Sequence, residues 1–170
     1  LGGAYEARRA LAAGSNAVVW RKLVADTLTP VGAALRLIEP GRGDFLLESV
    51  EGGTVRGRYS LLGLDPDLVF RAQGVRAECN PQWRTDREAF AACPDDPLTA
   101  LRSLLAQCRI DVPAGLPPAL ASMVGYFAYE TLGLAEDVAR PAAPGIGLPD
   151  LLFVRPTLLL VFDNLGEELS

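Results

Sequence analysis

Most of the apolar runs in this chain are no longer than a β-strand, and this constrains the fold more than any other feature. Turn-forming clusters such as Pro40-Gly41-Arg42-Gly43 and Asp65-Pro66-Asp67 separate the runs. Short apolar runs joined by tight turns are typical of antiparallel strands. The sequence therefore predicts an antiparallel meander in the first half. Its expected strands are Phe45 to Val50, Tyr59 to Leu64, Leu68 to Ala72 and Val75 to Cys79.

Ahead of this meander, the sequence predicts a helix followed by a strand. Ser15-Asn16 can cap a helix over AVVWRKLVADTL (residues 17–28), while its start, Val18-Val19-Trp20, also suits a strand. Pro30 is expected to end any helix there. Residues 31–38 (VGAALRLI) then predict a strand.

After the meander, the pattern predicts one amphipathic helix and further strands. Asp96 can cap the helix, with Pro97 in its first turn. Strands are expected within residues 122–130 and along LPDLLFVRPTLLLVFDNL (residues 148–165), with a bend at Pro156. Strands, a helix and more strands without βαβ alternation predict an α+β fold with a largely antiparallel sheet. The expected apolar face of the helix is Leu98, Leu101, Leu104, Leu105 and Cys108.

Size and charge narrow the class of protein. A chain of 170 residues, 49% of them hydrophobic, buries roughly 70% of its unfolded surface when it folds. We therefore expect one core and a single domain over residues 1–170. The net charge of -5 and the scattered arginines argue against nucleic acid as a partner. No apolar run reaches the roughly 18 residues of a membrane-spanning helix.

Residue types that carry chemistry are scarce. The chain has no histidine, which removes Ser-His and Cys-His pairs and imidazole metal sites, and Lys22 is its only lysine. The odd set Cys79, Cys93 and Cys108 has no CxxC spacing, so reduced thiols in a cytoplasmic protein are expected rather than a disulfide scaffold or zinc site. We therefore expect no catalytic and no metal-binding residue in this segment.

The stretch FLLESVEGGTVRGRYSLLG (residues 45–63) carries more polar groups than a plain hairpin needs. In a strand, Leu47 and Ser49 share one face, and Glu48 points away unless a bulge turns it. Gly52-Gly53 would let a ligand approach the backbone closely. A carboxylate, a hydroxyl and two arginines beside apolar residues suit a small zwitterion with an apolar body. The alternative is a glycine hairpin with surface ion pairs, each worth roughly 0–1 kcal/mol.

Several motifs, in the same order, resemble the N-terminal domain of anthranilate synthase component I. The resemblance runs from about residue 16 to the end of the chain. The motifs are LLES (residues 46–49) with VEGG and RYSLLG (residues 58–63) after it, Val24-Ala25-Asp26 with Thr29-Pro30-Val31, MVGYFAYE (residues 123–130) and the closing LPDLLFVRPTLLLVFDNL.

The resemblance implies a lyase of tryptophan biosynthesis that converts chorismate to anthranilate. Ammonia would come from a glutamine amidotransferase partner, component II, either separate or fused. In this family the chorismate and Mg²⁺ ligands belong to a C-terminal catalytic domain, which is expected beyond residue 170. This segment alone is therefore expected to be inactive.

The resemblance also implies that the segment carries part of an allosteric site for feedback inhibition by L-tryptophan. Leu47, Glu48 and Ser49 would touch the inhibitor, and Arg58 or Tyr59 would lie across the pocket. Family members that use a lysine near Tyr59 differ from this chain, which has none there. Two alternatives remain: the N-terminal domain of aminodeoxychorismate synthase component I, of folate synthesis, and a free-standing small-molecule binding domain.

Overall fold

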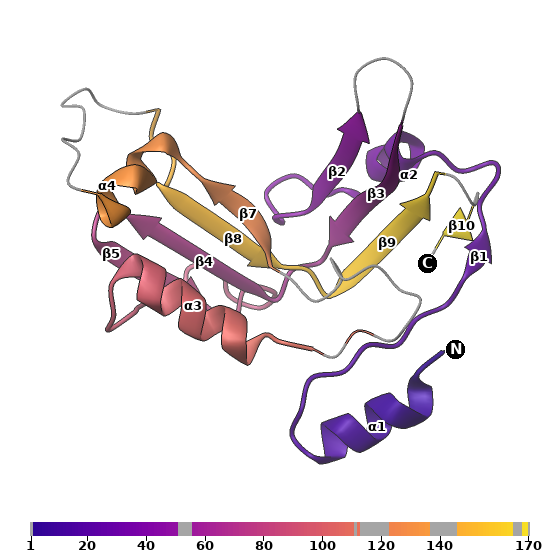
Figure 1. The fold of residues 1–170 in the computed structure, drawn as a ribbon, viewed down its shortest axis with the longest axis horizontal. Coiled ribbons are helices and arrows are strands. Elements are labelled where there is room, and N and C mark those ends of the chain that lie inside the picture. The colour runs from indigo at the N-terminus through magenta and orange to yellow at the C-terminus, as the bar shows by residue number, and fades with distance from the viewer. Residues whose placement is uncertain are drawn as a thin grey trace. The chain divides into compact units, whose positions relative to one another are not determined.

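The computed structural model describes residues 2–50, 56–110, 112, 123–136, 146–164 and 168–169, without the side chains of 49–50, 56–58 and 168. The chain divides into two compact units (Figure 1). The first unit is Leu1–Pro66, Ile110–Ala121 and Pro156–Ser170, and the second is Asp67–Arg109 and Ser122–Arg155. The buried apolar residues form a separate cluster in each unit. The expected single domain stays a prediction.

Each unit contains a five-stranded sheet whose described strands all pair antiparallel. Together with the helices, this confirms the α+β class. In the first unit the strand order is β1-β10-β9-β3-β2. These strands are β1 (Leu23–Val24), β10 (Glu168–Leu169), β9 (Leu158–Asp163), β3 (Arg56–Leu64) and β2 (Phe45–Val50).

Helix α2 (Pro30–Leu37) covers one face of the first unit's sheet. Its small residues Ala33 and Ala34 are buried against Leu62, Leu64 and Phe162, which come from neighbouring strands β3 and β9. Close packing of alanine onto the sheet lets the helix backbone approach it, and the face with even-numbered β3 residues becomes the core face.

The strand predicted over residues 31–38 is wrong, because this segment is α2. Pro30 begins the helix instead of ending one: its fixed φ and missing N–H suit the first helical position. Thr29 caps the helix, and its side-chain oxygen accepts a hydrogen bond from the Gly32 amide at 3.0 Å.

The helix predicted over residues 17–28 is also wrong. Only Leu23–Val24 (β1) is regular there, and it pairs with β10. Trp20 forms an isolated antiparallel bridge with Gly2, so the strand alternative for this apolar start is closer to the structure. The helix of this region, α1 (Ala4–Ala12), lies further upstream.

The second unit builds its core between a sheet and α3 (Pro97–Gln107), as Figure 1 shows. Its strand order is β6-β5-β4-β8-β7. The predicted cap is confirmed, since the Asp96 carboxylate accepts hydrogen bonds from the Leu98 and Thr99 amides. Leu105 is an exception to the predicted face, because it is exposed. The strands are β4 (Leu68–Gln73), β5 (Arg76–Asn80), β6 (Ala91–Ala92), β7 (Val124–Phe127) and β8 (Leu151–Arg155).

The predicted four-strand meander is wrong in one connection. After Leu64 the chain leaves the first unit's sheet, and it enters the second unit's sheet at Leu68. It returns between β8 and β9, around Pro156. Asp65 has a positive φ of 52°, a conformation that aspartate tolerates better than most residues. Each half of the meander is therefore a hairpin of its own sheet.

The remaining segments are short. The strand predicted within residues 122–130 is confined to β7, and a 3-10 turn (Tyr129–Thr131) and helix α4 (Leu132–Ala135) follow it. Asp150 is buried and accepts hydrogen bonds from the Gln73 side chain and the Gly74 amide. Among the described residues no helix has the length and apolarity needed to cross a membrane.

Candidate functional site

The predicted ligand-binding residues lie on β2 and β3, at the edge of the first unit's sheet. Leu47 pairs with Leu61 and Glu48 with Ser60, so Leu47 and Glu48 face opposite sides of the sheet. Leu47 is 45% exposed, a high fraction for a leucine within a strand. Glu48 is also exposed and is on the same side as the α2 core.

Tyr59 lies on the same face of the sheet as Leu47. It pairs with Asp163 of β9, two positions before Leu61, which is the partner of Leu47. The ring is half-buried. The structure therefore brings Leu47 and Tyr59 together on one face and puts Glu48 on the other.

The other two predicted residues, Ser49 and Arg58, belong to β2 and β3, but their side chains lie outside the described residues. The same holds for the glycine pair at residues 52–53. The roles of all five residues as a binding site stay predictions.

The ladder between β2 and β3 is irregular at the end where the site is predicted. It is regular from the Phe45–Gly63 pair to the Glu48–Ser60 pair, and then shifts so that Val50 pairs with Arg56. Residues that a ladder irregularity leaves unpaired can be turned out of the alternating pattern. The strand end carrying Glu48 is therefore built differently from the rest of the hairpin.

Ser60 is a polar residue near the site to which the sequence analysis gave no role. It is buried, with 3% of its surface exposed, and the Asn164 amide nitrogen lies 3.3 Å from its hydroxyl oxygen as a donor. Its even number was an available signal, because it shares the core-facing parity of Leu62 and Leu64. The hydroxyl lies beside Glu48 in the sheet.

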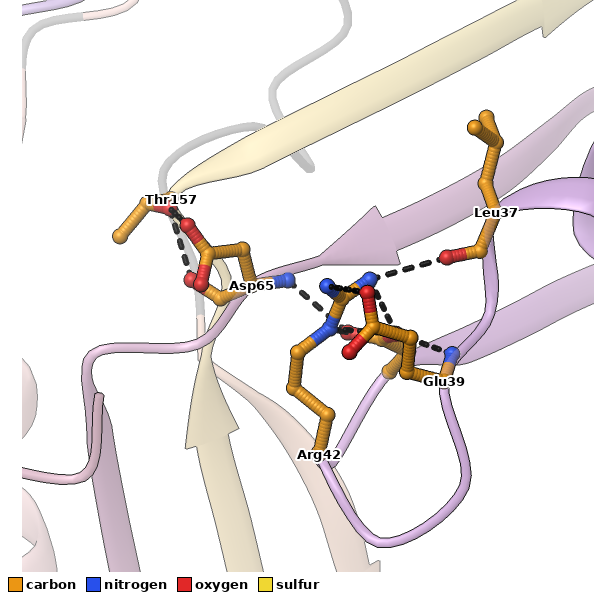
Figure 2. Close-up of polar contacts among 6 residues, drawn as sticks. Leu37, Glu39, Arg42, Asp65 and Thr157 are labelled. Atoms are coloured by element: carbon orange, nitrogen blue, oxygen red, sulfur yellow. Dashed lines mark hydrogen bonds and ion pairs between the residues drawn. The ribbon is translucent and has the colours of Figure 1, made fainter. Parts of the chain in front are cut away.

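At the other end of β2, a buried ion pair fixes the chain (Figure 2). The Asp44 side chain is fully buried, and its two oxygens accept hydrogen bonds from Arg42 and from the amides of Glu39 and Asp65 at 2.7–2.9 Å. Arg42 also donates to the Leu37 carbonyl at 2.9 Å and to the Glu39 carboxylate at 2.7 Å. The pair therefore joins the end of α2, the turn after it, β2 and the end of β3.

The electrostatics of this pair favour its charged form. Burial by itself would raise the pKa of Asp44, but the hydrogen bonds from Arg42 and from two amides outweigh it, so its pKa is below the ordinary value. The hydrogen bond to Asp44 raises the pKa of Arg42. Both groups are therefore charged at neutral pH.

A link to β9 extends the network. The Thr157 hydroxyl donates to the Asp65 carbonyl at 2.7 Å (Figure 2). The Thr157 amide donates to the Leu64 carbonyl at 3.2 Å. These hydrogen bonds hold the end of β3 against the start of β9.

Two observations concern metal binding and thiol chemistry in the described residues. The described residues contain no group of three or more His, Cys, Asp or Glu placed to hold a metal ion. Burial, reinforced by Cys93 and Cys108, raises the pKa of Cys79 to about 11, so this thiol is protonated at neutral pH and a poor nucleophile. The β2–β3 hairpin carries the exposed side chains of Leu47 and Glu48 and the half-buried ring of Tyr59.

The chain is similar to proteins named "Anthranilate synthase component 1". It is 40% identical over 158 residues (93% of this chain) to that of Cereibacter sphaeroides. It is 34% identical over 157 residues (92% of this chain) to that of Mycolicibacterium smegmatis, and 35% identical over 149 residues (88% of this chain) to that of Thermus thermophilus. The chain spans 32%, 29% and 30% of the lengths of these relatives.

A solved structure agrees at the level of fold. The crystal structure of anthranilate synthase component I from Streptococcus pneumoniae matches with a TM-score of 0.54 at 20% identity, over 90% of this chain and 31% of that one. No protein-family model matches the chain. Over the residues that it shares with these relatives, the chain belongs to the anthranilate synthase component 1 family.

Proposed function

We propose that these residues are part of an anthranilate synthase component I, which converts chorismate and ammonia to anthranilate and pyruvate. The observation that carries this proposal is the 40% identity to the Cereibacter sphaeroides protein of that name. Because the chain spans 32% of that relative, the activity belongs to a longer protein. Chorismate and Mg²⁺ would bind in the remainder, and a glutamine amidotransferase would supply the ammonia.

The composition of the chain supports a non-catalytic role for this part. It has no histidine and a single lysine, Lys22, so the usual general bases near neutral pH are nearly absent. Burial also raises the pKa values of two of its three cysteines, Cys79 and Cys93. We therefore propose that this segment regulates the enzyme.

The regulation we propose is feedback inhibition by L-tryptophan at the end of the β2–β3 hairpin. Leu47 is exposed on the face that also carries Tyr59, and two such side chains suit an indole ring. Glu48 lies on the other face, at the last regular pair of the ladder, so it would accept a hydrogen bond from the ammonium group around the edge of β2. Ser49 and Arg58 are the candidate partners of the carboxylate.

Inhibition of this kind is a coupling between two sites. A coupling free energy of about 1–3 kcal/mol would change the affinity roughly 5- to 150-fold. Tryptophan must then make different contacts in the active and inhibited arrangements, because a ligand that binds both equally shifts nothing.

Turnover tests the first part of the proposal. The full-length protein, given chorismate, ammonia and Mg²⁺, should produce anthranilate, which is followed by its fluorescence. The 170 residues alone should produce none. Aminodeoxychorismate as the product of the full-length protein, or turnover by the 170 residues alone, would contradict the proposal.

Substitution of Ser49 tests the second part. In the full-length enzyme, Ser49→Ala and Ser49→Phe should raise the tryptophan concentration needed for half inhibition, with uninhibited kcat nearly unchanged. Ser103→Ala, an exposed serine on α3 of the second unit, is the matched control and should change neither quantity. An inhibition constant that Ser49→Phe leaves unchanged would exclude Ser49 as a contact.

A further inference from the structure

We infer that the Arg42–Asp44 ion pair fixes the register of β2 against β3. It would thereby determine which side chains of β2 face the proposed tryptophan site. This inference rests on the proposed function, because it concerns the site at residues 47–49. It adds residues outside that site, at the opposite end of the same strand.

Register matters for β2 because of the two-residue period of a strand. A slip by one residue would move Leu47 to the core side and Glu48 to the Tyr59 side. Among the described strands of the first unit's sheet, β2 is at the edge with β3 as its partner, and no second described strand helps to hold it. The register must therefore be fixed by contacts within the hairpin and by what packs on it, as Leu46 does on the α2 core.

The end of the hairpin next to the proposed site does not provide this control. The ladder shifts between Glu48 and Val50, so that end already departs from regular pairing. The opposite end is regular, and both of its register-specific contacts involve residues next to each other in the chain, Asp44 and Phe45.

The first of these contacts is the hydrogen bond from the Asp65 amide to the Asp44 carboxylate, 2.9 Å long. In a slipped hairpin this amide would face a different residue, and the buried carboxylate would lose a donor. The second is the ring of Phe45, which lies against Gly63 so closely that a Cβ there would collide with it. Only a glycine opposite Phe45 permits this packing.

The ion pair makes the first contact rigid. Arg42 holds Asp44 through its Nε and Nη2 atoms, and the same guanidinium binds the Leu37 carbonyl at the end of α2. Asp44 is thus fixed relative to a helix packed on the sheet, and a slip of β2 would have to break the fork. Bidentate arginine–carboxylate pairs combine strength with this geometric specificity.

Asp44 acts on the site only through the strand. At about 3.3 Å per residue, it lies roughly 16 Å from Ser49 along β2, and its carboxylate oxygens are occupied by protein donors. Asp44 and Arg42 are therefore positioning residues and touch no ligand.

The test uses the full-length enzyme with Asp44→Asn, and with Arg42→Lys as a milder variant that keeps the charge but loses the fork. Asp67→Asn is the matched control, since Asp67 forms a bidentate pair with Arg155 in the second unit. Hydrogen exchange of the amides of residues 45–48 and the tryptophan concentration for half inhibition are measured on each protein.

We expect Asp44→Asn to speed exchange at residues 45–48 about tenfold or more and to weaken tryptophan inhibition about tenfold, with uninhibited kcat little changed. Arg42→Lys should produce smaller changes in the same direction. Asp67→Asn should leave both readouts of β2 as in the parent. Unchanged exchange in both first-unit variants, or an equal effect of Asp67→Asn, would overturn the inference.

The outcomes also separate this inference from the proposed function. If Ser49→Phe weakens inhibition and Asp44→Asn does not, the site stands and the positioning role fails. If tryptophan has no effect on the parent enzyme, the proposed regulation fails, and the exchange rates of residues 45–48 alone decide whether the pair holds β2.

Discussion

Each unit of the molecule contains an arginine–aspartate pair, and the two pairs are built for different purposes. Arg42 and Asp44 are two residues apart, and the Asp44 side chain is fully buried. Arg155 and Asp67 are far apart in the chain, and about a third of each side chain is exposed. The local pair closes a turn and orients one strand, whereas the distant pair ties the end of β8 to the entry of β4.

The two hydrophobic cores differ in the size of the side chains that they pack. The second unit packs aromatic residues such as Phe70 and Phe153 between its sheet and α3. The first unit packs the small alanines of α2 onto Leu62 and Phe162. The first unit also has a buried carboxylate at one end of β2 and an irregular ladder at the other.

Truncating the most buried side chains should give the largest effects and tests whether the two cores act separately. Phe70→Ala should lower the free energy of unfolding by about 4 kcal/mol and Leu62→Ala by about 3 kcal/mol, through lost burial and the cavity left behind. Both side chains are 0% exposed.

The experiment uses the 170 residues, whose two tryptophans provide the readout. Trp20 belongs to the first unit and Trp83 to the second. In single-tryptophan proteins made by Trp→Phe substitution, urea unfolding followed by fluorescence should show Leu62→Ala mainly at Trp20 and Phe70→Ala mainly at Trp83. Equal shifts at both tryptophans would show one cooperative unit and would remove the basis of the comparison.

Replacing one glycine in each unit by alanine should lower stability less than the core truncations do. The two costs should differ according to whether the added Cβ meets backbone or a side chain. A Cβ at Gly125 in the second unit would collide with the Leu152 carbonyl oxygen, which belongs to the backbone of β8. At Gly63 in the first unit, the three atoms nearest to an added Cβ all belong to the ring of Phe45, a side chain that can move. Gly125→Ala should therefore cost about 3 kcal/mol and Gly63→Ala about 2 kcal/mol of stability.

A double substitution checks the reason for this difference. Phe45→Ala removes the obstacle at Gly63, so Gly63→Ala should cost less in the Phe45→Ala background than in the parent. Phe45→Ala should not relieve Gly125→Ala. Additive costs at Gly63 and Phe45, from urea unfolding of the four proteins, would contradict the ring contact.

Local signals in the sequence predicted much of the second unit. Asp96-Pro97 identified the start of α3, and the three- and four-residue spacing identified its buried Leu101. The apolar runs of β4 and β8 also correspond to observed strands. The helix makes its hydrogen bonds within itself, and the two strands are marked by their apolar runs and flanking turns, so local patterns were sufficient to locate them.

The first unit was less predictable because its elements depend on distant partners. Pro30 was expected to end a helix, but a proline can also begin one, and the apolar residues after it pack on the sheet as the face of α2 through Ala33 and Ala34. Asp65-Pro66-Asp67 looks like a hairpin turn, although the strands on its two sides join different sheets. Such choices are made by tertiary contacts that no local pattern contains.

At the candidate site the structure bears on the strand geometry, while the binding roles stay predictions. Strand alternation correctly separated Leu47 from Glu48, because it depends only on the two-residue period. The buried position of Asp44 was not predicted, because it requires the amide of Asp65, which lies 21 residues away. The sequence motif therefore identified the strand, and the structure was needed to find what holds it.

The smallest expected effect is an acid-dependent loss of stability that distinguishes the first unit's ion pair. The pKa of Asp44 is lowered in the folded protein: burial opposes this shift, and hydrogen bonds from Arg42, Glu39 and Asp65 outweigh it. A carboxyl group with a lowered folded-state pKa stabilises the protein above its unfolded pKa, about 3.9. This contribution disappears as the pH falls through the folded-state value.

The parent protein should therefore lose stability below about pH 5. In that range Asp44 is protonated in the unfolded state but still ionised in the folded state, so acid favours unfolding. Asp44→Asn should be less stable at pH 7 but lose less on acidification, so the two stability curves should converge toward low pH. Urea midpoints between pH 7 and pH 2.5, followed at Trp20, measure this, and Asp67→Asn serves as the control from the second unit. Parallel curves for the parent and Asp44→Asn would mean that Asp44 titrates alike in the folded and unfolded states, and that the buried fork does not hold it in the charged form.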